Sequence, residues 1–142
     1  MSDAPDPNRP AQPYPAPSPD TDFFWTSGES GMLRFKQCAA CGHYLHPPKP
    51  RCPECLSDRI EIVAVSGRAT VAAKTVNYHP WHPAFPPPYV LAIVEIAEAP
   101  YVRLTTRIVT ADPEGVAIGD AVRVRFEQAG PAWLPLFEPE AK

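Results

Sequence analysis

The sequence predicts a mainly β protein in which a small metal-binding ribbon precedes an antiparallel barrel. Its four cysteines form two pairs with CxxC spacing, Cys38 with Cys41 and Cys52 with Cys55. From residue 60 onward, β-branched residues recur in alternating runs that are bounded by short turns. No segment carries the period of a long helix. These observations favour a barrel of about five strands, with a β-sandwich as the alternative.

Before the ribbon, the chain predicts a proline-rich tail and a short helix. Seven of the 21 prolines fall between Pro5 and Pro19, in a segment with almost no aliphatic side chains. Such a segment buries too little surface to offset the entropy of ordering, so residues 1–19 are predicted to be disordered or polyproline-like. The run of aromatic residues at 23–25 predicts a short helix whose rings must pack on something.

Residues 20–59 are predicted to hold this helix and the ribbon, with a strand at 32–37 and a loop at 45–51. Two CxxC pairs separated by a loop can place four thiolates around one cation, the closed tetrahedral shell of structural zinc sites. Iron is able to occupy the same shell. Gly42 and Pro53 suit the tight turns that such a shell requires. Two disulfides, or a redox-active CxxC, are the alternatives, and neither fits the spacing as well.

The barrel is assigned to residues 60–142. Residues 60–66 and 68–78 are expected to form one long strand, bent or bulged at Gly67. Further strands are expected at 89–98, 101–110 and 121–127, with a turn at 116–120 before the last of them.

Bulk properties narrow the classes of function. The net charge is −3 and the sequence pI is about 5.8, so there is no overall basic field of the kind that attracts nucleic acid or anionic membranes. No apolar run approaches ~18 residues, and the N-terminal segment lacks the pattern of a signal peptide. We therefore expect a soluble, cytoplasmic protein with reduced thiols, bound to neither nucleic acid nor membrane.

The order of these features resembles the DUF35 family, proteins that join a rubredoxin-like zinc ribbon to a five-stranded OB-fold barrel. The resemblance covers residues 20–138. The motifs that carry it are Phe24-Trp25, Cys38-Ala39-Ala40-Cys41-Gly42, His46-Pro47-Pro48, Arg51-Cys52-Pro53-Glu54-Cys55, Ser66-Gly67-Arg68, Pro88-Tyr89, Ile118-Gly119-Asp120 and Leu134-Pro135-Leu136-Phe137. The longer proline-rich tail and Pro86-Pro87-Pro88 depart from the family pattern.

The resemblance implies a function. Members of the family act as small acyl-CoA-binding or scaffolding subunits of thiolase-like, aldolase-like and hydroxymethylglutaryl-CoA-synthase-like enzymes. It therefore implies a non-catalytic accessory subunit in a hetero-oligomer, working in acyl-CoA chemistry such as lipid or steroid metabolism. One zinc ion per chain is the expected cofactor.

The residues themselves give little support to catalysis by this chain alone. The cysteines are committed to the metal, and no nucleophile accompanied by a base is apparent. His79 and His82 are the side chains that look reactive. His43 and His46 adjoin the metal ligands, but a complete set of four cysteines leaves them as neighbours rather than ligands.

Two further sets of side chains are candidates for binding. Lys49, Arg51 and Arg68 are positioned in the sequence to pair with the phosphates of CoA if ribbon and barrel form a cleft. Aromatic residues are the candidates for a groove or a partner contact, and they are Phe24, Trp25, Trp81 and Phe85. The alternative for these rings is packing in the core.

OB-folds also bind single-stranded nucleic acid, which gives a second hypothesis for function. Such binders combine a basic groove with stacking aromatic side chains on their strands. Here the chain is acidic overall, and its central strands carry Val, Ile, Ala and Thr. The accessory-subunit hypothesis is therefore preferred.

Overall fold

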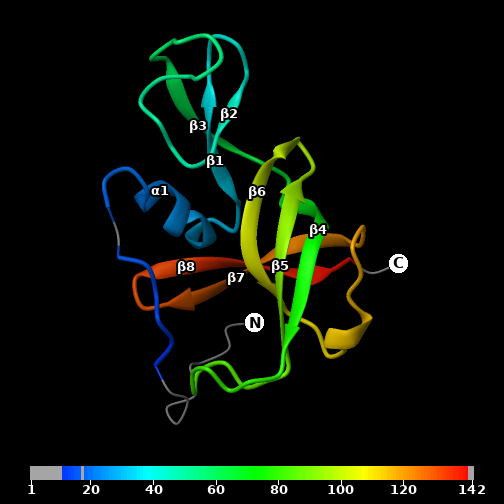
Figure 1. Cartoon of the computed structure of the whole chain (residues 1–142). Coiled ribbons are helices and arrows are strands. Elements are labelled where there is room, and N and C mark those ends of the chain that lie inside the picture. Colours follow the sequence, from blue (N-terminus) through cyan, green and yellow to red (C-terminus); the bar gives the residue numbers. More distant parts are fainter. Residues whose placement is uncertain (1–10, 17, 141–142) are drawn as a thin grey trace.

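The computed structural model describes residues 11–16 and 18–140 and divides their strands between two sheets (Figure 1). In chain order the elements are α1 (Asp22–Trp25), the 3-10 helix η1 (Ser27–Glu29), β1 (Arg34–Cys38), β2 (Tyr44–Leu45), β3 (Ile60–Ala64), β4 (Arg68–Asn77), β5 (Tyr89–Ile96), β6 (Ala99–Ile108), the 3-10 helix η2 (Pro113–Gly115), β7 (Ala121–Ala129) and β8 (Ala132–Pro139). The first three strands form the ribbon, which stands above the barrel in the view of Figure 1. The mainly β fold with a short N-terminal helix is confirmed.

The last five strands close into a barrel in the order β4-β5-β6-β8-β7. Neighbouring strands are antiparallel except β6 and β8, which meet in parallel where Ile108 faces Phe137. Closure distinguishes this OB-fold from a sandwich, because a sandwich keeps two separate sheets.

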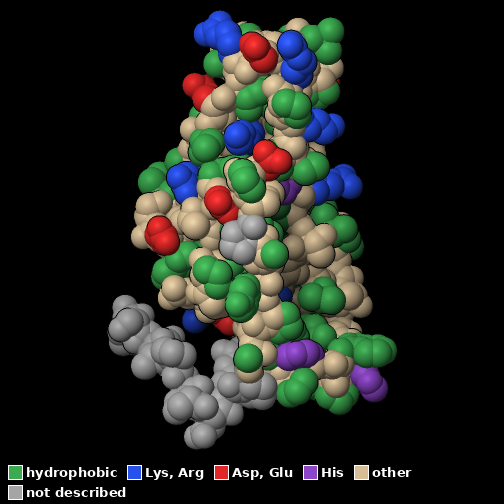
Figure 2. Space-filling view, turned by 90° about the vertical axis from the view of Figure 1, so that its left-hand side faces the viewer, with side chains coloured by type: hydrophobic (Ala, Val, Ile, Leu, Met, Phe, Trp, Pro, Cys, Tyr) green, Lys and Arg blue, Asp and Glu red, His purple; other side chains and the backbone are tan. Residues whose placement is uncertain are grey.

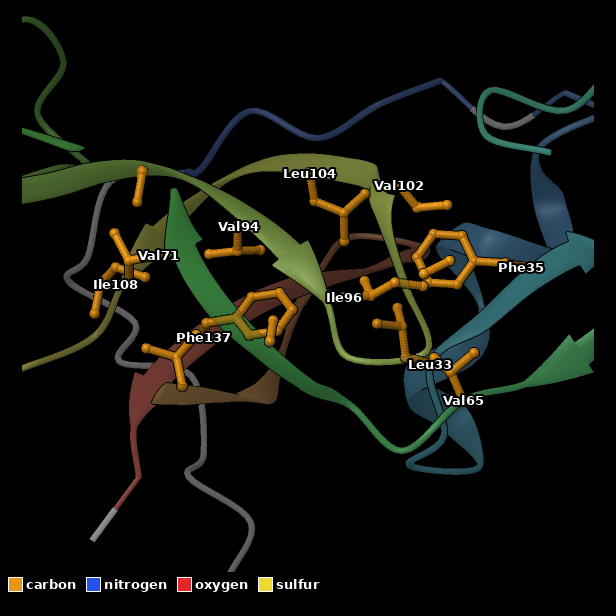
Figure 3. Close-up of a cluster of buried hydrophobic side chains, with 14 of the residues drawn as sticks. Leu33, Phe35, Val65, Val71, Val94, Ile96, Val102, Leu104, Ile108 and Phe137 are labelled. Carbon is orange, nitrogen blue, oxygen red and sulfur yellow. The ribbon is translucent and has the colours of Figure 1, made fainter. Parts of the chain in front are cut away.

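The barrel interior is filled by alternate residues of its strands, as the period of two requires. On β5 these buried residues are Val90, Ala92, Val94 and Ile96, and on β6 they are Val102, Leu104, Thr106 and Ile108. Figure 3 shows Val94 and Phe137 pointing toward one another inside the barrel. The same cluster continues into the ribbon side through Leu33, Phe35 and Val65, so ribbon and barrel share one core (Figure 3).

The expectation of one long strand over residues 60–78 is wrong. β3 pairs antiparallel with β1 over its whole length, from Arg34 opposite Ala64 to Cys38 opposite Ile60, whereas β4 belongs to the barrel. Gly67 separates the two strands with a φ of 81°, and a Cβ there would lie 2.5 Å from a methyl group of Val124. The glycine thus turns the chain from one sheet into the other.

Two strands were not anticipated by the sequence. The two-residue strand β2 lies where a loop was expected to begin, and β8 completes the barrel despite Pro135 and Pro139. The carbonyl of Pro135 accepts a hydrogen bond of 2.9 Å from the Thr106 hydroxyl, which ties β8 to β6.

The prediction of disorder for residues 1–19 concerns, for the most part, residues 1–10 and 17, and these lie outside the described residues. Residues 11–16 form neither helix nor strand. None of the helices in the described part of the chain is long or apolar enough to cross a membrane.

Candidate metal centre and partner-facing surfaces

The four cysteines converge at the end of the ribbon. Their sulfur atoms all lie within 4.8 Å of one another, and the closest pairs, Cys38 with Cys55 and Cys41 with Cys52, are 3.5 Å apart. Four sulfurs about 2.3 Å from a tetrahedral metal are about 3.8 Å from each other. The observed spacing therefore fits one metal ion, in agreement with the zinc ribbon predicted from the two CxxC pairs.

The two cysteine pairs lie in two backbone turns of the same kind. In the first turn the Cys38 N–H donates to the His43 carbonyl and the Gly42 N–H donates to the Cys38 carbonyl, both at 2.8 Å. The second turn repeats this pattern at 2.9 Å, with Cys52, Ser57 and Leu56 in the corresponding places. The repetition requires a left-handed residue after each pair, which is Gly42 at φ 82° in one turn and Leu56 at φ 64° in the other.

The thiols cannot all ionise at this spacing without a cation. Desolvation raises the pKa of Cys38, but hydrogen bonds from the backbone N–H groups of Cys41 and Ala40 lower it more, to about 6. The His43 N–H lowers the pKa of Cys41, but desolvation and the neighbouring thiols raise it to about 12. The Cys38 thiol therefore ionises readily, whereas ionisation of the Cys41 thiol is opposed. A bound divalent cation supplies the positive charge that stabilises all four thiolates together. A closed set of four sulfurs leaves no open position for substrate, which makes the centre structural.

Neither histidine near the cysteines takes part in this cluster. The His43 ring stacks on Tyr101 of the barrel with centroids 4.8 Å apart. The His46 ring packs against Phe24 and Phe35, and desolvation lowers its pKa. Both rings therefore serve the contact between the ribbon and the rest of the molecule.

The three basic candidates are distributed over different surroundings. Lys49 lines a cavity of about 90 Å³ between ribbon and barrel, together with His43 and Tyr101. Arg51 donates to the Leu56 carbonyl at 3.1 Å and so braces the second cysteine turn. Arg68 pairs with Glu140 at 3.3 Å. Of the three, Lys49 lines the cavity.

The aromatic candidates divide into buried and exposed rings. Phe24 is 6% exposed and belongs to the core, and Trp25 packs against the same cluster. Phe85 is half-buried, with the Arg107 guanidinium 5.3 Å from its ring centroid. Trp81 is 71% exposed.

Trp81 is held in place although it is exposed. Its indole N–H donates to the Asn77 side-chain oxygen at 3.0 Å, and the Asn77 amide donates to the His79 carbonyl at 2.8 Å. The His79 ring lies 4.2 Å from the Trp81 ring, and Tyr78 beside it is 61% exposed. Figure 2 shows histidines among hydrophobic side chains at this end of the molecule. Tyr78 belongs to the same aromatic, proline-rich loop, residues 78–85, that the sequence marks as a candidate groove or partner contact.

Comparisons with known proteins agree with this architecture. Residues 25–61 match the family described as ChsH2, rubredoxin-like zinc ribbon domain, and residues 62–127 match ChsH2, C-terminal OB-fold domain. The chain is 34% identical to a DUF35 domain-containing scaffold protein of Methanothermobacter thermautotrophicus, over 68% of this chain and 72% of that one.

Two longer relatives are also similar. A probable enoyl-CoA hydratase alpha subunit of Thermomonospora curvata is 38% identical over 90% of this chain. The 3-oxo-4,17-pregnadiene-20-carboxyl-CoA hydratase alpha subunit of Mycobacterium tuberculosis is 38% identical over 89% of it. The chain spans 40% of the length of each.

Among solved structures, a chain of the Ltp2-ChsH2(DUF35) aldolase superposes with a TM-score of 0.79 and 37% identity. The match covers 89% of this chain and 98% of that one.

Proposed function

The chain belongs to the ChsH2/DUF35 family, whose members join a zinc ribbon to an OB-fold domain, and from this premise we propose that it is an accessory subunit of an enzyme complex. The partner in this proposal is a thiolase-like or aldolase-like subunit that acts on acyl-CoA. The names of the similar proteins support it, since they include an aldolase complex, scaffold proteins and subunits of CoA-thioester hydratases.

The strongest support for the proposal is Trp81, an aromatic side chain on the barrel that is ordered but exposed. Trp81 is fixed by its hydrogen bond to Asn77 and still presents most of its surface to solvent. Tryptophan is enriched at the centres of interfaces, and a side chain that is already ordered loses little entropy on docking. Proline-rich flanks at 80–88 stiffen the loop that carries it.

The chemistry of the described residues supports an accessory role rather than a catalytic one. All four cysteines lie in the metal cluster, so no thiol is left to attack a thioester. The ring nitrogen Nδ1 of His82 accepts a hydrogen bond from the Ala84 backbone at 3.0 Å, and the His79 ring is packed on Trp81. Neither ring has a nucleophilic side chain among its hydrogen-bond partners in the described part of the chain.

The proposal includes direct contact between this chain and CoA. Lys49 lines the cavity between ribbon and barrel together with the stacked His43 and Tyr101 rings, and its positive charge suits a phosphate of CoA. Arg51 braces the second cysteine turn and Arg68 pairs with Glu140, so the proposal places the contact in this cavity on Lys49. Lys49→Ala is expected to weaken CoA binding by the complex, and Lys74→Ala, an exposed lysine on β4, serves as the matched control.

The proposal is tested by recovering the partner. The tagged chain is purified from its native host, the co-purifying protein is identified by mass spectrometry, and the two are then reconstituted from separate preparations. A thiolase-like or aldolase-like partner whose acyl-CoA turnover depends on this chain would support the proposal. Turnover of acyl-CoA by this chain alone, abolished by a single substitution within it, would overturn it.

A further inference from the structure

The sheet of the ribbon has one open edge. Its strands lie in the order β2-β1-β3, so β2 and β3 form the two edges (Figure 1). β2 has two residues, and soon after it come Pro47 and Pro48, which have no N–H to offer another strand. β3 has five residues and no proline, and in the described part of the chain it pairs with β1 alone. A strand edge of this kind can accept a further strand.

The register fixes which backbone groups of β3 point away from β1. At the two ends of the pair, the Val65 N–H donates to the Leu33 carbonyl and the Ala39 N–H donates to the Arg59 carbonyl. In an antiparallel pair, residues that exchange hydrogen bonds alternate with residues whose N–H and C=O face the other side. Residues 59, 61, 63 and 65 therefore bond toward β1, and residues 60, 62 and 64 face away from it.

Both ends of this outward side are closed. The Ile60 N–H donates to the Asp58 carbonyl at 2.9 Å, and the Ser66 N–H donates to the Glu98 carboxylate at 2.6 Å. Between these ends lie the outward N–H and C=O groups of residues 62 and 64, which have no hydrogen-bond partner among the described residues. One short antiparallel segment satisfies all four groups, with two hydrogen bonds at each residue.

The side chains of this stretch determine which segment fits it. Ile62 is 45% exposed, and Ala64, on the same face of the sheet, is exposed as well. On the other face Arg59 and Glu61 are exposed, and neither forms an ion pair within the part of the chain that the structure describes. Apolar neighbours and neighbours of opposite charge stabilise paired strands. A matching segment therefore has apolar side chains opposite residues 60, 62 and 64, a basic one opposite Glu61 and an acidic one opposite Arg59.

The edge is held in place before anything pairs with it. Ile60 at one end of β3 lies opposite Cys38, a residue of the metal cluster. Val65, just beyond the other end, is 6% exposed and belongs to the core that ribbon and barrel share. Because both ends are fixed, the strand loses little conformational entropy when a segment binds.

A second copy of this chain fits the edge poorly. Two antiparallel β3 strands that pair through residues 62 and 64 never place Glu61 of one copy opposite Arg59 of the other. With Ile62 opposite its own copy, the two Glu61 carboxylates become diagonal neighbours on one face, where like charges oppose pairing. A pair of five-residue strands is also small beside the total surface of about 1,200 Å² that a stable interface buries.

We propose that the outer edge of β3 binds an extended segment of another protein, which adds to the ribbon as a fourth, antiparallel strand. The segment has apolar side chains at alternate positions and a lysine or arginine opposite Glu61. The inference is independent of the enzyme partner proposed above, because the β4–β5 loop that carries Trp81 lies at the far end of the barrel from the ribbon (Figure 1).

The test titrates a peptide into the full, zinc-loaded chain and follows the amide signals by NMR. The probe is Thr-Val-Thr-Val-Lys-Val-Glu-Thr with blocked ends, in which the second valine falls opposite Ile62 and the lysine opposite Glu61. We expect shifted signals and slowed amide exchange at residues 62 and 64. A probe with glutamate in place of the lysine should bind about fivefold more weakly, and Glu61→Lys should reverse the order of the two probes.

Methylation of the probe's backbone tests the hydrogen bonds while the protein stays unchanged. A methyl group on the nitrogen of the second valine removes its hydrogen bond to the Ile62 carbonyl and should weaken binding at least tenfold. The matched control carries the methyl group on the lysine nitrogen, which faces away from β3 in this register. The control should bind as the unmodified probe does.

Several results would overturn the proposal. They are no binding at millimolar probe, shifts confined to other surfaces such as the loop at 78–88, equal affinities of the two methylated probes, and an order of the charge-swapped probes that Glu61→Lys leaves unchanged. A dimer that forms with rising concentration and protects the amides of residues 62 and 64 without any probe would make a second copy the occupant, and would overturn it too.

Discussion

At the scale of single residues, Leu56 adopts a backbone conformation that its side chain opposes. It is the counterpart of Gly42 in the second cysteine turn, with φ 64°, and its side chain is 69% exposed. A left-handed conformation costs a non-glycine residue about 1–2 kcal/mol, and little packing offsets that cost here. Glycine loses more chain entropy on folding, which reduces the net difference.

Leu56→Gly is therefore expected to stabilise the folded chain by about 1 kcal/mol. Thermal melts of the zinc-loaded protein measure the change. Leu56→Ala is the control, because alanine keeps the strain and should give no such gain. A lower melting temperature for Leu56→Gly would show that the leucine side chain makes a stabilising contribution instead.

Gly67 differs from Gly119 in what surrounds it, although both have positive φ. A Cβ at Gly67 would meet Val124 at 2.5 Å, whereas nothing lies within 4 Å of one at Gly119. We expect Gly67→Ala to lower the free energy of unfolding by about 3 kcal/mol, from conformational strain plus overpacking, and Gly119→Ala to lower it by about 1 kcal/mol. Denaturant unfolding of both variants checks this, and equal losses would contradict a role for the contact with Val124.

His46 is expected to make the folding stability of the chain depend on pH. Desolvation lowers its pKa in the folded chain, and its Nδ1 is buried without a hydrogen-bond partner in the described structure. Because its folded pKa lies below the unfolded value of about 6.5, this group's favourable contribution is fully present above pH 6.5 and is lost as the pH falls toward the folded pKa.

His46→Phe should therefore flatten the loss of stability as the pH falls below about 6.5, and should add about 1 kcal/mol by removing an unpaired buried nitrogen. Phenylalanine matches the aromatic neighbours Phe24 and Phe35. Melting curves in excess zinc at several pH values measure both effects. An unchanged pH dependence would exclude His46 as its source.

At the scale of elements, the metal organises a sheet that has little core of its own. The buried cluster around the cysteines contains Leu45 besides the ligands, whereas Leu33 and Phe35 pack with the barrel. Cys55→Ser should lower zinc content well below one per chain and remove amide protection from β1–β3, while β5 stays protected. Elemental analysis together with hydrogen exchange separates the outcomes. A metal-free variant with a fully protected ribbon would contradict the idea.

The elements that the sequence predicted are those whose signals are local. The two CxxC pairs lie close in the chain, and the alternation on β5 and β6 is visible within eight to ten residues. β8 was missed because Pro135 and Pro139 argue against a strand, although it pairs with β7 along its whole length across the short turn at 130–131. The pairing of β3 with β1 was missed because register between strands is set in three dimensions.

At the scale of the whole molecule, the fold buries one aromatic side chain and leaves another exposed. Phe24 and Trp81 were both candidates for docking on sequence grounds, since exposure cannot be deduced from residue type. In the fold, Phe24 is 6% exposed where α1 meets the ribbon and the barrel, and Trp81 is 71% exposed at the far end of the barrel. The packing of distant segments decides which aromatic ring is left for a partner.

Trp81→Ala is expected to leave the melting temperature and zinc content of the free chain unchanged, because the ring contributes little to the core. It should weaken the complex with the partner enzyme by about 2 kcal/mol, roughly thirtyfold in Kd. Phe24→Ala should instead destabilise the free chain by about 3 kcal/mol through the cavity it leaves. Melting curves of the free variants and titration against the purified partner measure the two effects. If Trp81→Ala binds the partner as tightly as the wild type does, Trp81 is not part of the docking surface. The hydrogen bonds of Asn77 to Trp81 and His79 would then serve only to order the loop.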